Sequence, residues 1–162
     1  LIIVYVWFRF RSMSGPSAGI MALVALFHDV IIVFVTFVIL RIAINETFIA
    51  VILTIVGYSI NDTIVIYDRI RENIRLEEGK MTLVELVDLS INQPLGRTIN
   101  TSIATIGAML VTYVFASIYG IVSIQQFALP MTIGLISGFY STVFIATPLW
   151  ITWKTRGDRS GI

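Results

Sequence analysis

The chain has 162 residues, of which 57% are hydrophobic and only 13% are charged, and its mean hydropathy is +0.91. Soluble domains carry about 25% charged residues, so this composition excludes the soluble classes and predicts an integral membrane protein. A net charge of +1 leaves no positive excess for phosphates, which argues against nucleic-acid binding. The absence of cysteine and the single histidine argue against thiol chemistry and zinc sites. We therefore expect no enzymatic activity, no metal and no cofactor.

Four windows of the sequence are long and apolar enough to cross a membrane, which takes roughly 20 residues. They cover residues 18–40, 47–67, 97–116 and 127–150. The opening run, 1–10, is too short to cross, and we expect it to be the end of a truncated span. The sequence therefore predicts an all-α fold: one transmembrane domain over 1–162, built as a polytopic helix bundle.

A polar stretch between the second and third windows carries a helix-start signal. Thr82 followed by Glu85 matches a capping box, and apolar residues then recur at helical spacing. We expect a short amphipathic helix over 82–91 that lies on the cytoplasmic face. Pro94 is typical of a first helical turn, so the third span is predicted to begin near it.

The distribution of basic residues predicts the orientation in the membrane. Of the eleven Lys and Arg residues, only Arg41 falls in a connection on one side, and the others share the opposite side. Short basic loops stay in the cytoplasm. The sequence therefore predicts a cytoplasmic carboxyl terminus and an external Arg41.

Asp62 is one of three ionisable residues, with His28 and Asp29, whose position inside a span costs energy. It lies about six residues inside its span, or about 9 Å deep, where a short side chain cannot easily reach bulk water. Arg97 opens the next span from the same side, and Thr101 follows one turn later. A carboxyl group balanced between desolvation and a nearby cation can load and release a proton, so these three residues predict a proton relay. The alternative is a fixed ion pair that only joins the two helices.

Two further features of the spans have weaker implications. His28 and Asp29 are adjacent, so they point about 100° apart around their helix. They could pass protons or could form a hydrogen-bonded helix contact. Gly134 and Gly138, four residues apart, are typical of close helix packing rather than of chemistry.

A long motif resembles a known family. Residues 57–75 read GYSINDTIVIYDRIRENIR, which closely resembles the signature of the SecF family of protein-export membrane proteins. Supporting matches are ALFHDV at 25–30, INQPLGRTINTS at 91–102 and GFYSTVFIATPLW at 138–150. The resemblance covers the whole chain and implies a helix bundle of the RND type that pairs with SecD. In the family the corresponding Asp, Arg and Thr carry the proton pathway, which here implies roles for Asp62, Arg97 and Thr101.

The resemblance also implies a function and a location. We expect a subunit of a Sec accessory complex, driven by the proton motive force, in the bacterial cytoplasmic membrane. The implied partners are SecD, the SecYEG translocon, the translocating preprotein and membrane lipid, with YajC as a further candidate. Secreted proteins would be drawn outward by domains that precede this segment in the family.

Several alternatives stay open. The chain could be half of an RND-type exporter of lipids or small molecules, a passive scaffold, or an intramembrane hydrolase that uses Asp29 and Asp62 as a dyad. The coupling ion is also open, because Asn61 and its neighbours Ser59 and Thr63 could supply oxygen ligands to Na⁺ beside Asp62. The resemblance favours H⁺, and Asn61 is a secondary site residue together with His28 and Asp29.

Overall fold

The computed structural model describes residues 16–76 and 81–159, so the predicted truncated span over 1–10 lies outside the described residues. Within these ranges the chain is helical and contains no strand. The elements are α2 (Pro16–Ile39), α3 (Glu46–Leu76), α4 (Leu83–Ile118), α5 (Val122–Ser141), the π-helical turn η1 (Thr142–Ala146) and α6 (Thr147–Arg159). Four stretches of helix are long and apolar enough to cross a membrane, and α5, η1 and α6 together form the last of them.

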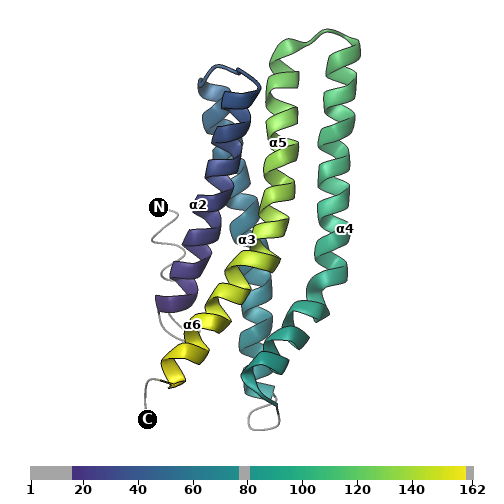
Figure 1. Cartoon of the computed structure of the whole chain (residues 1–162). Helices are drawn as coiled ribbons and strands as arrows, with labels where there is room; N and C mark the ends of the chain where they lie inside the picture. Colours follow the sequence, from purple (N-terminus) through teal and green to yellow (C-terminus); the bar gives the residue numbers. More distant parts are fainter. Residues whose placement is uncertain (1–15, 77–80, 160–162) are drawn as a thin grey trace.

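The helices run up and down in one bundle (Figure 1). Helices α2, α3 and α5 pack against one another, and α4 lies at the edge against α3 and α5. The short connections 40–45 and 119–121 lie at one end of the bundle, while α6 and the beginning of α4 lie at the other. This arrangement places both long polar extensions, on α3 and on α4, at the same end.

The packing of α2, α3 and α5 depends on a small residue. A methyl group added at Gly134 would lie 2.7 Å from Ile55 Cγ1 and 2.9 Å from Val33 Cγ2, so no larger side chain fits without movement. Ile55 and Val33 belong to a buried apolar cluster shared by the three helices. The prediction that Gly134 serves close packing is confirmed.

Helix α4 differs from the sequence-based expectation. A separate amphipathic helix over 82–91 and a new start at Pro94 were expected, but one continuous helix runs from Leu83 to Ile118 with Pro94 inside it. The capping box is present: the Thr82 amide donates to Glu85 Oε2 over 2.9 Å, and Thr82 Oγ1 accepts from the Glu85 amide over 3.4 Å. Proline lacks an N–H and crowds the preceding turn, which bends a helix without necessarily ending it. Figure 1 shows α4 changing direction in its lower part.

Hydrogen bonds to α3 fix the position of the first part of α4, before Pro94. Asn73 is buried, and its Nδ2 donates to Ser90 Oγ and to Gln93 Oε1, each over 2.9 Å. Arg69 Nε also donates to Gln93 Oε1. These bonds lie just before Pro94, so they compensate for the hydrogen bond that the proline cannot make.

Candidate functional site

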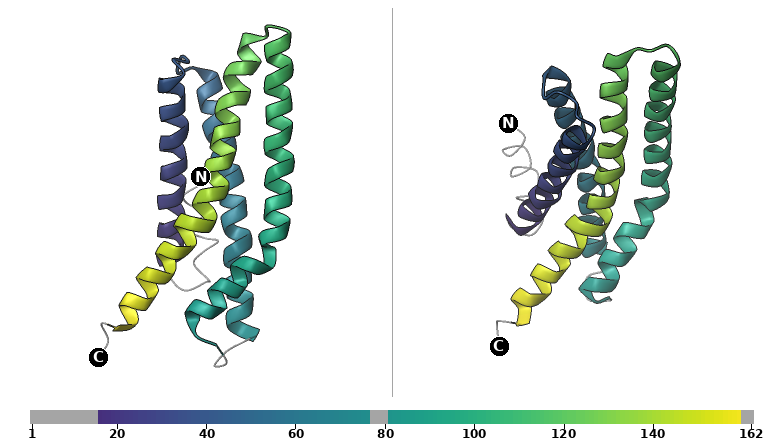
Figure 2. Two further views of the ribbon diagram at one scale, coloured as in Figure 1. Left: turned by 45° about the vertical axis from the view of Figure 1, so that its right-hand side comes forward. Right: turned by 45° about the horizontal axis from the view of Figure 1, so that its top comes forward.

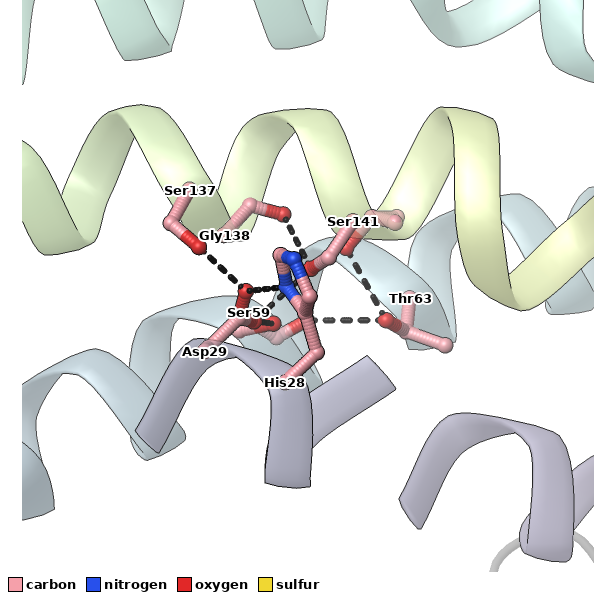
Figure 3. Close-up of polar contacts among 8 residues, drawn as sticks. His28, Asp29, Ser59, Thr63, Ser137, Gly138 and Ser141 are labelled. Carbon is pink, nitrogen blue, oxygen red and sulfur yellow. Dashed lines mark hydrogen bonds and ion pairs between the residues drawn. The ribbon is translucent and has the colours of Figure 1, made fainter. Parts of the chain in front are cut away.

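Asp29 is the centre of a buried polar cluster between α2, α3 and α5 (Figure 3). Its side chain is completely buried, and three serine hydroxyls donate to it. Ser137 donates to Oδ1 over 2.7 Å, while Ser59 and Ser141 donate to Oδ2 over 2.8 and 2.7 Å. Nδ1 of His28, whose side chain is 36% exposed, lies 3.3 Å from Oδ1. The structure thus brings His28 and Asp29 into one cluster in which both carboxylate oxygens have partners.

A second group of contacts ties α3 to the π-helical turn. Thr63 donates to the Ser59 carbonyl over 2.9 Å and lies 3.1 Å, hydroxyl to hydroxyl, from Thr142, the first residue of η1. Tyr67 donates to the carbonyl of Ala146, the last residue of η1, over 3.2 Å. A π-helical turn is rare and is often found at functional sites. Helix α3 therefore contacts both ends of the irregular turn.

Asp62 lies between these two groups along α3. It is 7% exposed, and its Oδ2 is buried without any hydrogen-bond partner among the described residues. Arg97 lies close enough for Coulomb attraction to Asp62, but its side chain is exposed, and no ion pair joins the two described residues within 4.0 Å. A buried carboxylate oxygen that lacks a partner is unusual and requires an explanation.

Helix α4 presents a different set of hydroxyls to α3 than the sequence suggested. After Pro94, the buried hydroxyl residues of α4 are Thr98 and Ser102, and Ser102 Oγ lies 3.5 Å from the Tyr58 hydroxyl. Thr101 is exposed, and its hydroxyl donates to the carbonyl of Arg97 over 2.9 Å within the helix. Arg97 and Thr101, which were predicted to form a relay with Asp62, are therefore both exposed in the described structure.

The remaining site predictions have different outcomes. Asn61 is exposed and makes no described contact with the Asp29 cluster. The hydrolase dyad is not formed, because no hydrogen bond joins Asp29 to Asp62 and the oxygens of Asp29 are occupied by serine hydroxyls. Among the described residues no group of three or more His, Asp or Glu could hold a metal ion.

Sequence reasoning missed Ser137 and Ser141 as partners of Asp29. Their spacing of four residues puts them on one face of α5 beside Gly134 and Gly138. That small-residue face was assigned to packing alone. The serines within it could have indicated that a buried polar group lies opposite.

These features define a class: a polytopic α-helical membrane protein with a buried, hydroxyl-lined acidic site. The family described as "Protein export membrane protein SecD/SecF, C-terminal" matches residues 1–156, and the chain belongs to this family. A protein translocase subunit SecF of Alicyclobacillus acidocaldarius is 42% identical over 98% of this chain and 52% of its own length. A protein translocase subunit SecDF of Bacillus subtilis is 40% identical over 96% of this chain and 20% of its own length.

Solved structures agree with this assignment. A crystal structure of SecDF in a super-membrane-facing form is 38% identical, has a TM-score of 0.84, and matches over 98% of this chain and 20% of that one. A crystal structure of SecDF from Thermus, described as a translocon-associated membrane protein, is also 38% identical and has a TM-score of 0.81 over 94% of this chain and 20% of that one. The SecF resemblance and the all-α bundle of the RND type are confirmed. The chain spans about half the length of the SecF relative and 20% of the length of the SecDF relative.

Proposed function

We propose that this chain forms the membrane part of a SecF-type subunit in a Sec accessory complex that uses the proton motive force to aid export of secreted proteins. The observation that carries the proposal is the match along nearly the whole chain to proteins named translocase subunit SecF, at 42% identity in one case. Matches to SecDF proteins and to their crystal structures support it. None of these relatives favours the alternative of an exporter of lipids or small molecules.

In this proposal Asp62 exchanges the transported proton. It is an ionisable residue in a spanning helix, and such residues usually serve ion pathways. Its buried Oδ2 has no hydrogen-bond partner in the described part of the chain, which leaves an acceptor for a proton. Arg97 and Thr101 assist from α4, with Arg97 acting on Asp62 through its charge. His28, Asp29 and Asn61 have secondary roles.

SecD is the proposed principal partner. Relatives named SecDF contain the matching segment as 20% of a longer chain, so the two parts are joined in those proteins. The exposed side chains of Arg97 and Thr101 on α4 offer a polar surface at which SecD would complete the proton site. SecYEG, YajC and the translocating preprotein are proposed as further partners, which copurification with the full-length protein would test.

Asp62→Asn tests the proton role. The amide keeps the shape of the side chain but cannot take up and release a proton near neutral pH. In membrane vesicles that contain the full-length protein and its partners, we expect the variant to lose the gradient-stimulated part of secretion and to keep the part measured without a gradient. Asp88→Asn, at an exposed position on the first part of α4, is the matched control.

The same assay separates the other outcomes. Full stimulation of the Asp62→Asn protein by a proton gradient would overturn the relay role. Loss of the variant protein from the membrane would instead mean that Asp62 has a structural role. A Na⁺ gradient that stimulates secretion in place of a proton gradient would overturn the choice of H⁺.

The proposed topology places the chain in the bacterial cytoplasmic membrane, with the carboxyl terminus in the cytoplasm. The end of the bundle that carries the polar extensions of α3 and α4 would then be cytoplasmic. Because this chain has no cysteine, single cysteines at Arg41, Arg71 and Lys154 would report their side directly. We expect external labelling only at position 41, and external labelling at position 71 would overturn the topology.

A further inference from the structure

The cluster around Asp29 joins three helices next to the proposed proton site. We propose that Asp29 is a positioning residue for Asp62: it holds α3 through Ser59 and α5 through Ser137 and Ser141, and so sets where Asp62 lies. This inference rests on the proposed function. Under this proposal Asp29 and Asp62, the two buried carboxyl groups among the described residues, have different roles.

The hydrogen bonding of the two carboxyl groups supports this division. Each oxygen of Asp29 accepts at least one serine hydroxyl over 2.7 to 2.8 Å, in a site with no solvent exposure. An ionised carboxylate only accepts hydrogen bonds, so the serines satisfy Asp29 as a charged group and bind it in place. Asp62 instead has a buried oxygen without a partner among the described residues. One carboxylate is held by its neighbours, and the other has an acceptor free for a proton.

The link from Asp29 to Asp62 is short. Ser59 precedes Asp62 by three residues, so their side chains are neighbours on one face of α3, with about 5–6 Å between Cβ atoms. Thr63, next to Asp62, bonds to the Ser59 carbonyl and contacts Thr142 of η1. Asp62 is therefore flanked by two residues that are tied to the last span, one of them through Asp29.

The helices approach closely enough for these bonds because of Gly138. A methyl group added there would lie 3.3 Å from Ser59 Cβ and 3.8 Å from Asp29 Oδ2. These distances leave little room for α3 to rotate while the serine bonds are intact. The position of Asp62 is therefore coupled to the hydrogen bonds of Asp29 in addition to the apolar packing of α3.

Few ionisable groups surround the cluster. His28 adjoins Asp29 on α2, and Arg97 on α4 acts on Asp62. On α3, Asp62 lies one turn after Ser59, and Tyr58 precedes Ser59 with its hydroxyl 3.5 Å from Ser102 of α4. The sequence of α5 contains no Asp, Glu, Lys, Arg or His, and its one ionisable residue, Tyr140, is exposed. A serine on α5 can therefore be removed without removing a charge.

The test is the titration of Asp62 in the full-length protein with its partner in membranes. The infrared carboxyl band of Asp62 is identified as the band that Asp62→Asn removes. Ser59→Ala and Ser137→Ala each remove one bond to Asp29 and leave every charge in place. We expect both variants to move the midpoint of the band by about 0.5 pH unit or more. The Ser137 hydroxyl donates to Asp29, with no described bond to α3, so a shift in Ser137→Ala that the α5 control lacks identifies Asp29 as the link.

Thr132→Val is the matched control. Thr132 is a buried hydroxyl residue of α5 whose hydroxyl bonds only to its own helix, at Ala128, so the midpoint should not move. Unmoved midpoints in both serine variants, with normal protein levels, would overturn the inference. A second outcome would also overturn it: Asp29→Asn abolishes gradient-driven secretion, while both serine variants keep the wild-type midpoint and the wild-type secretion rate. Asp29 would then carry the proton itself. If wild-type Asp62 did not titrate at all, the proposed function would fail, and this inference with it.

Discussion

Helix α4 and the last span contrast sharply in how they are packed. In the last span, 61% of the most apolar window is buried within the described structure, against 11% in α4. Figure 2 shows α4 at the edge of the bundle and α5 between its neighbours. Three residues of the last span are buried in the interior, namely Gly134, Ser137 and Ser141, whereas Arg97 of α4 is exposed. The buried contacts of the bundle thus involve mainly the last span, while the proposed functional surface lies on α4.

The outward face of α4 is unusual for a surface that would touch lipid. Arg97, Asn100 and Thr101 are all exposed there. A charged side chain in the hydrocarbon costs a few kcal/mol on insertion scales, so it usually faces protein or water. We therefore expect changes on this outward face of α4 to affect function with little effect on stability, and changes at the packing glycine Gly134 of α5 to affect stability first.

Among changes on α4, Arg97→Ala should show the largest functional effect. Arg97 makes no ion pair among the described residues, so its removal should leave the thermal stability of the protein almost unchanged. Loss of its charge next to Asp62 should remove most gradient-stimulated secretion. Secretion by vesicles and thermal unfolding of the same preparations measure the two effects.

Arg97→Lys sharpens this prediction. Lysine keeps the charge but lacks the planar five-donor fork, so it should retain part of the stimulation. If Arg97→Ala unfolded the protein at a clearly lower temperature, α4 would contribute to the fold through this residue, and the contrast with α5 would be wrong.

The sequence predicted the features that depend on local pattern. Hydropathy windows indicated four helices long and apolar enough to cross a membrane, the depth of Asp62 indicated a costly buried carboxyl group, and Thr82 with Glu85 indicated a helix start. It could not predict the partners of Asp29, because Ser137 and Ser141 lie 108 and 112 positions away, and only tertiary packing brings them together. The length of α4 was missed for the same reason, since the bonds of Asn73 to α4 support the helix just before Pro94.

Gly134→Ala should show the largest effect on stability. The added methyl group would lie 2.7 Å from Ile55 in a fully packed interior, and overpacking of this kind typically costs about 1–3 kcal/mol of unfolding free energy. Gly107→Ala on α4 is the matched change, because nothing lies within 4 Å of its added methyl group. Alanine is better than glycine within a helix, so Gly107→Ala should be neutral or stabilise by up to about 1 kcal/mol. Equal losses in both variants, measured by unfolding in detergent, would remove the contrast between the two helices.

Thr82→Ala should show the smallest effect, confined to the first turn of α4, before the predicted span begins at residue 97. Thr82 accepts from the Glu85 amide, and the hydrogen bonds that its backbone and its side chain make to Glu85 lower the pKa of that carboxyl group. A lowered pKa in the folded state means that the ionised form stabilises the helix start at neutral pH, and that this contribution is lost as the pH falls through the pKa of the folded protein.

We expect the variant to show less amide-exchange protection over residues 82–91 at neutral pH, with a difference from wild type that shrinks in acid. Protection factors corrected for the intrinsic exchange rate at each pH measure this. Because Pro94 lacks an N–H and the bonds of Asn73 hold the helix just before it, the loss should stop before that residue. Protection lost along the whole helix would mean that its two parts open as one unit.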